Sequence, residues 1–232
     1  MLPRVWGEDG DMSRWEIRIA AVIGAVVVGL TPSVTLAAEK PGLATAVLET
    51  LPVKGRAPKT GYTRDQFGAA WADVDHNGCD TRNDILKRDL TGIVFKVGTR
   101  SCVVASGELV DRYSGETINF VRGNVTSMEV QIDHVVALSN AWQTGAFKLT
   151  ADQRKALAND PLNLFAVKGR LNSQKGDGDA ATWLPPLKSF RCTYVAQQIA
   201  VKAKYSLWVV APEKAAMVSI LAKCPSQKVP VS

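Results

Sequence analysis

The stretch that decides the fold lies near the middle of the chain. It reads EVQIDHVVALSNAW at residues 129–142 and NDPLNLFAVKGRLNSQKGD at residues 159–177. Apolar and polar residues alternate at 130–132, and residues 164–167 form a short apolar run, so each is expected to be a strand. The basic segment 168–175 is expected to be a helix. The stretch therefore predicts two short strands followed by a helix.

The pair Asp133-His134 closes the first of these strands. Successive side chains of a strand point to opposite faces, so both residues can serve one site only if the strand ends or bulges here. Asp133 offers a hard oxygen ligand for Mg²⁺ or a similar ion. His134 titrates near neutral pH and is expected to act as a general base. Asn163 has no acid or base chemistry, and we expect it to hold the backbone or ring of His134 in position.

The helix expected at 168–175 carries a second metal ligand. Asn172 supplies a neutral amide oxygen, while Lys175 lies one turn later on the same face and Lys168 one turn earlier. Cations around a metal ligand suit a phosphate backbone, and Arg170 adds to this basic segment. The residues thus predict a one-metal site that cleaves phosphodiester bonds with a water nucleophile.

The same segments resemble the ββα-metal motif of HNH nucleases. The matching pieces are Ile132-Asp-His-Val-Val136, Asn163-Leu164 and Asn172-Ser-Gln-Lys-Gly-Asp177. Together with the stretch Cys79-Asp-Thr-Arg-Asn83, they resemble exported HNH proteins related to the C-terminal domain of GmrSD restriction endonucleases. The resemblance covers roughly residues 61–224.

This resemblance implies a ββα-metal (HNH) core. Short β-branched runs at 93–97, 102–105 and 108–111 predict a small antiparallel sheet beside it. With additional helices and two disulfides, the predicted fold class is α+β. The resemblance also implies His134 as the general base, Asp133 and Asn172 as metal ligands, and Asn163 as the middle residue of the motif. Asparagine instead of histidine at 172 suits Mg²⁺, or alternatively Mn²⁺, better than zinc. Ala137 stands where a proline is common, a departure that touches loop geometry and not chemistry.

The composition agrees with a globular protein whose partner carries phosphate. The chain has 232 residues, 46% of them apolar and 22% charged, and a formal net charge of +6. A positive excess favours nucleic acid as a partner and would also suit an anionic membrane surface. Only two histidines occur and no CxxC pair, so the closely spaced ligands of a structural zinc site are absent from the sequence.

The four cysteines indicate two disulfides if the chain is exported. Three connectivities exist for four cysteines. We favour the sequence-local pairs Cys79–Cys102 and Cys192–Cys224, because each closes a short loop. The alternative is four buried free thiols.

The amino terminus reads as a secretory signal. Arg14 and Arg18 precede an uncharged run at residues 19–30, and small residues before position 39 offer a cleavage site. We therefore predict a signal peptide over residues 1–38, with Met12 as the true start, and a secreted protein without membrane contact after cleavage. An uncleaved N-terminal membrane anchor is the alternative.

The remaining chain divides into a linker at 39–60, a nuclease domain at 61–225 and a tail at 226–232. Within the linker, residues 43–51 are a candidate short helix. The pattern Thr63-Arg-Asp-Gln66 predicts a capping box that opens a helix running through Trp71.

Before the expected sheet, residues 73–84 read DVDHNGCDTRND and resemble the first half of an EF-hand calcium loop. The calcium ligands at such a second site would be Asp73, Asp75, Asn77 and Asp84. We prefer an Asx-rich turn held by a disulfide, because Asp84 is shorter than the usual glutamate and Cys79 would be bonded. Arg82 is a candidate for contacting phosphate in the transition state.

These observations predict an exported, Mg²⁺-dependent HNH endonuclease, with DNA favoured over RNA as the substrate. The alternative is a non-catalytic exported module of the same fold that binds nucleic acid or calcium. A cell-wall hydrolase has less support, because the sequence offers no second catalytic histidine or cysteine. The sequence makes no prediction of oligomeric state.

Overall fold

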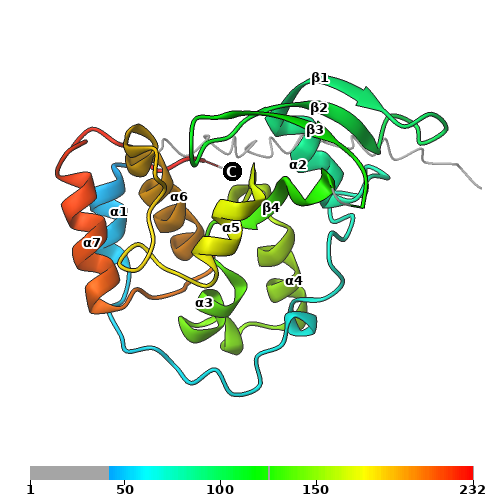
Figure 1. The fold of residues 1–232 in the computed structure, drawn as a ribbon. Helices are drawn as coiled ribbons and strands as arrows, with labels where there is room; N and C mark the ends of the chain where they lie inside the picture. The colour runs from blue at the N-terminus through cyan, green and yellow to red at the C-terminus, as the bar shows by residue number, and fades with distance from the viewer. Residues whose placement is uncertain (1–41, 125, 232) are drawn as a thin grey trace, which may run out of the picture. The chain divides into compact units, whose positions relative to one another are not determined.

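The computed structural model describes residues 42–124 and 126–231, so the predicted signal peptide lies outside the described residues. The helices are α1 (Ala44–Thr50), α2 (Thr81–Asp89), α3 (Leu138–Gln143), α4 (Ala151–Asn159), α5 (Gly169–Lys175), α6 (Arg191–Lys204) and α7 (Ala211–Leu221). The strands are β1 (Leu90–Phe95), β2 (Val104–Val110), β3 (Thr117–Val121), β4 (Val130–His134) and β5 (Leu164–Lys168). Short 3₁₀ segments are η1 (Arg64–Phe67), η2 (Thr126–Met128), η3 (Ala146–Lys148), η4 (Pro161–Asn163) and η5 (Lys188–Phe190). The fold is thus α+β, as predicted (Figure 1).

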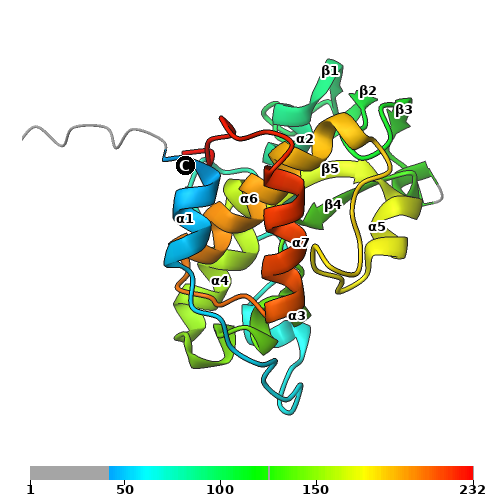
Figure 2. The ribbon, with the colours of Figure 1, turned by 90° about the vertical axis from the view of Figure 1, so that its left-hand side faces the viewer.

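The strands form two separate antiparallel sheets. One has the order β1-β2-β3, and the other is the two-stranded ribbon β4-β5. In the ribbon, Asp133 pairs with Phe165 and His134 with Leu164. Figure 2 shows the ribbon next to α5, which begins directly after β5. The small antiparallel sheet expected from the sequence is therefore present, but the runs at 102–105 and 108–111 form the single strand β2, and β3 is the third strand.

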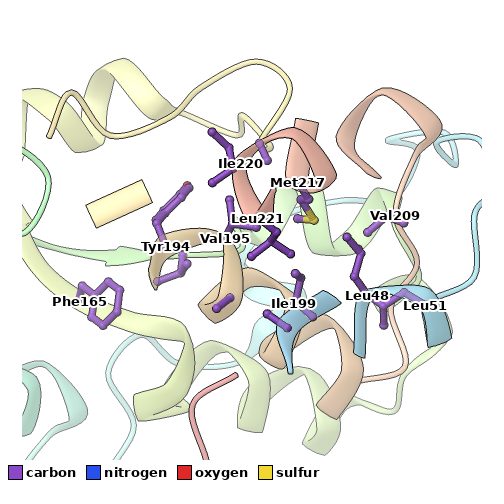
Figure 3. Close-up of a cluster of buried hydrophobic side chains, with 14 of the residues drawn as sticks. Leu48, Leu51, Phe165, Tyr194, Val195, Ile199, Val209, Met217, Ile220 and Leu221 are labelled. Carbon is purple, nitrogen blue, oxygen red and sulfur yellow. The ribbon is translucent and has the colours of Figure 1, made fainter. Parts of the chain in front are cut away.

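One core joins the terminal helices to the ribbon. Residues from α1, α6 and α7 pack together with β5, and Figure 3 shows Phe165 and Tyr194 at one side of this cluster. A second cluster unites α3, α4 and α6 around Phe67 and Trp142. A third lies between α2, the three-stranded sheet and the ribbon. The ribbon contributes residues to two of these clusters, so its position is fixed from both faces.

The region expected to be a linker is partly folded in the structure. Helix α1 buries Ala44 and Leu48 in the first core cluster, and the chain end returns to it through a hydrogen bond from Val229 N–H to the Gly42 carbonyl. The apolar face of the candidate helix at 43–51 explains the difference, because burying it stabilises the segment against the core. The folded body consequently includes residues upstream of 61 and downstream of 225.

The prediction of a helix from Thr63 to Trp71 is wrong. Only the 3₁₀ turn η1 forms, and within the described chain the Thr63 side chain does not cap it. Gly68 follows with φ of 77°, a left-handed conformation that ends the turn. By contrast, the capping box at α4 is present, with Thr150 and Gln153 exchanging hydrogen bonds as expected.

Both predicted disulfides are present, Cys79–Cys102 and Cys192–Cys224. The first joins the loop before α2 to the turn before β2, and the second joins the start of α6 to the residues after α7. Among residues 42–124 and 126–231, no helix is both long and apolar enough to cross a bilayer.

Candidate functional site

Strand β4 ends at His134, which meets the condition set by the adjacent pair Asp133-His134. Beyond it, the chain turns at Val135, whose N–H donates to the Asn163 carbonyl at 2.8 Å. Because the strand ends here, the two neighbouring side chains no longer have to point to opposite faces. Asp133, His134 and Asn172 line one small pocket of about 80 Å³.

Asn172 reaches this pocket because α5 starts immediately after β5 and packs on the ribbon. Gly169 permits the close turn, since a Cβ there would lie 1.9 Å from the Met128 carbonyl oxygen. The Asn172 amide donates to the Gln131 side chain on β4 at 2.9 Å. This hydrogen bond holds α5 against the strand that carries Asp133 and His134.

The His134 ring is buried, and it contacts the Ala158 carbonyl and the Trp71 indole. Its Nε2 lies 2.8 Å from the Ala158 carbonyl oxygen at the end of α4. A carbonyl only accepts, so Nε2 carries the proton and Nδ1 of the neutral ring is unprotonated. Burial lowers the pKa of His134 to about 4, and the charge of Arg64 acts in the same direction. Nδ1 forms no hydrogen bond with the described residues, and His134 lines the pocket shared with Asp133 and Asn172, so Nδ1 is the ring nitrogen left to accept a proton.

Trp71 covers the other side of this ring. Its indole is nearly parallel to the imidazole, with 5.8 Å between ring centroids and 12° between planes. Trp71 has φ of 58°, which is uncommon for a bulky side chain. The position of the tryptophan is therefore imposed by its surroundings.

Asn163 holds the loop that follows His134. Its Oδ1 accepts from the Val136 N–H at 2.8 Å, and its amide nitrogen donates to the Val136 and Leu157 carbonyls. The side chain is fully buried. Asn163 therefore connects the end of β4 to α4, which also supplies the Ala158 carbonyl.

Asp133, which lines the pocket, forms a buried ion pair with Lys175. The Lys175 ammonium donates to Asp133 at 2.9 Å and to the His134 carbonyl at 2.8 Å, and its side chain is fully buried. The Tyr113 hydroxyl donates to the other oxygen of Asp133. Burial raises the pKa of Asp133, while Lys175 and Tyr113 oppose this by stabilising the carboxylate. Lys175 thus faces the interior, which differs from the surface position that the phosphate contact predicted from the sequence would need.

The other predicted phosphate contacts are dispersed. Lys168 pairs with Glu116, Arg82 is half-buried and donates to the Val130 carbonyl, and only Arg170 is exposed. Burial lowers the pKa of Arg82, and the neighbouring charge of Arg122 lowers it further. None of these three side chains lines the pocket with His134 among the described residues.

The pocket offers the donor types that a hard divalent ion takes, although Asp133 also binds Lys175 and Tyr113. Asp133 and Asn172 line the pocket together and offer one carboxylate and one amide oxygen. Mg²⁺ usually keeps several waters and binds through one or two carboxylates plus substrate phosphate. Each Asp133 oxygen retains a lone pair beside its hydrogen bond. Over residues 42–124 and 126–231, no group of three or more His, Cys, Asp or Glu side chains is arranged to hold a metal.

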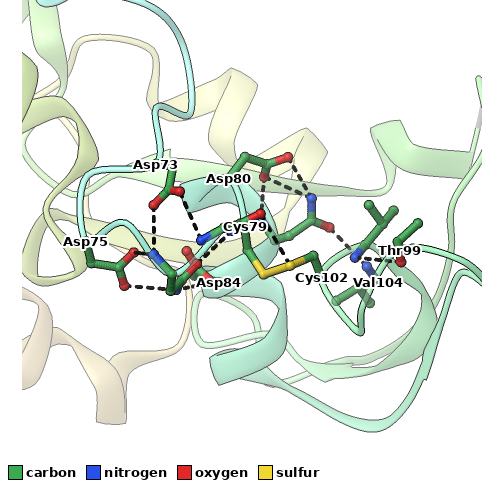
Figure 4. Close-up of a disulfide and its surroundings, with 12 residues drawn as sticks. Asp73, Asp75, Cys79, Asp80, Asp84, Thr99, Cys102 and Val104 are labelled. Carbon is green, nitrogen blue, oxygen red and sulfur yellow. Dashed lines mark hydrogen bonds between the residues drawn. A yellow bond between two sulfur atoms is a disulfide. The ribbon is translucent and has the colours of Figure 1, made fainter.

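The acidic loop before α2 is closed by its own hydrogen bonds (Figure 4). The Asn77 backbone N–H donates to Asp73 and Asp75, and the Asn77 side-chain amide donates to Asp75 and Asp84. The amide nitrogen of Asn77 thus lies among the carboxylates named as calcium ligands. The Cys79–Cys102 disulfide adjoins the loop.

Three neighbours of the site were missed by the sequence analysis: Arg64, Trp71 and Tyr113. They come from segments far from residues 129–177 in the chain, and no periodicity or motif connects them to His134. The Ala158 carbonyl carries no sequence signal at all, because every residue has one.

The chain is similar to a known domain family and to a secreted protein. Residues 80–220 match the family model described as GmrSD restriction endonucleases, C-terminal domain. An uncharacterized secreted protein of Arthroderma benhamiae is 39% identical over 209 residues, which cover 88% of this chain and 97% of that protein. No solved structure matches. The two disulfides fit an extracellular protein, like this secreted relative. The matched residues include the ribbon, α5 and every residue of the motif, and the chain therefore belongs to the family of GmrSD restriction endonuclease C-terminal domains.

Proposed function

We propose that this protein is an exported, metal-dependent endonuclease that hydrolyses phosphodiester bonds, with DNA as the favoured substrate. In this proposal β4, β5 and α5 form a ββα-metal core, and residues 1–38 are a signal peptide. The observation that carries the proposal is the convergence of Asp133, His134 and Asn172 on one pocket. The endonuclease family and the secreted relative support it.

His134 is the general base of the proposed reaction. The Ala158 carbonyl keeps the proton on Nε2, so Nδ1 is able to accept a proton from an attacking water molecule. The water oxygen bonds to phosphorus, the bond to the 3′-oxygen breaks, and the products are a 5′-phosphate and a 3′-hydroxyl. Since burial lowers the pKa of His134 to about 4, the ring is neutral before the reaction at ordinary pH.

The residues around His134 position it and the phosphate. Asn163 holds the loop after β4 by a hydrogen bond to Val136, and Lys175 donates a hydrogen bond to the His134 carbonyl. Asp133 and Asn172 would hold a divalent ion, Mg²⁺ or alternatively Mn²⁺. When bound, such an ion neutralises charge that develops on the leaving oxygen.

The proposal is tested with the purified mature protein and labelled DNA and RNA. Cleavage is followed in Mg²⁺, Mn²⁺, Ca²⁺ or Zn²⁺, with EDTA as the metal-free control and the His134→Ala protein alongside. We expect cleavage of DNA with Mg²⁺ that EDTA abolishes. Binding of nucleic acid without cleavage in any of the four metals would instead identify a non-catalytic module.

A further inference from the structure

Arg64 lies where two pockets meet at His134. One is the pocket shared with Asp133 and Asn172. The other, also about 80 Å³, is lined by His134 together with Phe67 and Trp71. Arg64 lines both, and among the described residues it is the one cationic side chain that lines either. Arg64 is therefore the cationic residue placed to contact a phosphate bound beside His134.

Arg64 forms no ion pair among the described residues. The side chain is exposed. By contrast, Lys175 is neutralised by Asp133, and Lys168 by Glu116. A guanidinium presents paired N–H donors that match two phosphate oxygens. Arg64 has both the position and the spare donors for such a contact.

The segment that carries Arg64 is anchored to α4. Phe67 is buried in the second core cluster, and Arg154 on α4 donates to the Gln66 carbonyl at 2.6 Å. The last turn of α4 also supplies the Ala158 carbonyl that orients His134. One helix thus contacts both the base and the segment that carries the cation.

We propose that Arg64 binds the scissile phosphate at His134, with its guanidinium on the non-bridging oxygens. This inference rests on the proposed nuclease function and deepens it. The guanidinium would stabilise the negative charge that these oxygens gain as water attacks phosphorus. It assigns to Arg64 the transition-state phosphate contact for which the sequence offered Arg82.

Binding is measured first in the His134→Ala background, so that cleavage does not interfere. The probe is a fluorescein-labelled 12-base-pair DNA duplex, and the readout is anisotropy over a series of salt concentrations. Adding Arg64→Ala is expected to weaken binding about ten-fold or more and to reduce the slope of log K against log salt by about 1. Arg64→Lys should keep the slope but not the full affinity, because it keeps the charge and loses the paired donors.

The matched control is Arg100→Ala, since Arg100 is also exposed and has no ion pair in the described chain. It should leave affinity and slope unchanged. Thermal melting confirms that each variant is folded. In the His134-containing protein, Arg64→Ala should slow cleavage about 100-fold.

The outcomes separate the two ideas. If Arg64→Ala binds and cleaves like Arg100→Ala, the assignment of Arg64 is overturned while the nuclease stands. If Arg64→Ala loses binding but the protein with His134 cleaves nothing, Arg64 binds phosphate and the nuclease proposal falls. If the protein does not bind the duplex at all, both are overturned.

Discussion

At the scale of single residues, the His134 imidazole is the group on which the proposed chemistry depends. Its proton is placed by a backbone carbonyl, and burial keeps the ring neutral. The same burial makes the folded state sensitive to acid. A histidine of this kind has an ordinary pKa near 6.5 when unfolded and about 4 when folded, so the unfolded chain binds more protons between these values.

The stability contributed by neutral His134 should accordingly be complete above about pH 6.5 and decline as pH falls towards 4. The expected loss is on the order of 3 kcal/mol. Urea unfolding in metal-free buffer at pH 7.5 and pH 4.5 measures it. His134→Gln should lose less stability than the natural protein over this range, while His76→Gln, on an exposed loop, should match the natural protein. Equal acid sensitivity of His134→Gln and the natural protein would contradict the buried neutral ring.

Lys175 provides a second prediction at this scale. Replacing it with methionine removes the ammonium and leaves the Asp133 carboxylate buried without its ion-pair partner. We expect Lys175→Met to lower the free energy of unfolding by about 3–5 kcal/mol. Arg170→Met on the same helix should change it by less than about 0.5 kcal/mol, because Arg170 is exposed. A small effect of Lys175→Met in urea unfolding would place the ammonium at the surface.

The sequence predicted which residues of the motif lie close together more accurately than it predicted how deeply each is buried. Helical spacing places Asn172 and Lys175 on one face, but spacing alone does not distinguish a face that meets solvent from one that meets Asp133. Trp71 and Arg64 could not be predicted as neighbours of His134, because their approach depends on how a long loop packs on α4.

At the scale of elements, the ribbon and α5 act as one unit. The sequence predicted both strands and the helix, and the site hypothesis required the strand end or bulge that the structure shows at His134. The alternation of apolar residues and the apolar run at 164–167 made this possible. The pattern at Thr63 gave a wrong helix prediction. A capping box needs helical residues after it, and here Gly68 ends the short turn η1. Local patterns are reliable here where burial agrees with them, as at α4.

Gly169 tests the unit directly. Alanine at this position would bring its Cβ against the Met128 carbonyl, so the start of α5 must shift away from η2, which leads into β4. We expect Gly169→Ala to lower the melting temperature by several degrees and to reduce cleavage, since Asn172 moves with the helix. Gly55→Ala is the control, as no heavy atom lies within 4 Å of a Cβ built there. An unchanged melting temperature of Gly169→Ala would contradict the close contact between residue 169 and the Met128 carbonyl.

At the scale of the whole molecule, the ribbon is fixed by helices on one face and by the three-stranded sheet on the other. The two disulfides brace different parts of this body. Their connectivity was predictable because each pair is local in sequence. What the sequence did not reveal is that α1 and the chain end join the core, since a segment rich in Pro, Gly and Lys resembles a linker.

The Cys192–Cys224 disulfide should matter for stability far from the site. It closes a sequence separation of 32 residues between α6 and the segment after α7. Replacing both cysteines with serine is expected to cost about 3–4 kcal/mol in urea unfolding, because the unfolded chain gains conformational freedom. Cleavage by the fraction that remains folded should be unchanged. Loss of cleavage in a folded double variant would mean that the disulfide also shapes the site.

The central claim is that His134 removes a proton from water during phosphodiester cleavage. The most direct measurement is the ratio of plasmid-nicking rates between the natural protein and the His134→Ala protein, both shown to be folded by melting, at saturating Mg²⁺. We expect the natural protein to nick at least about 100-fold faster than the His134→Ala protein. Nicking at equal rates by the two proteins would contradict it.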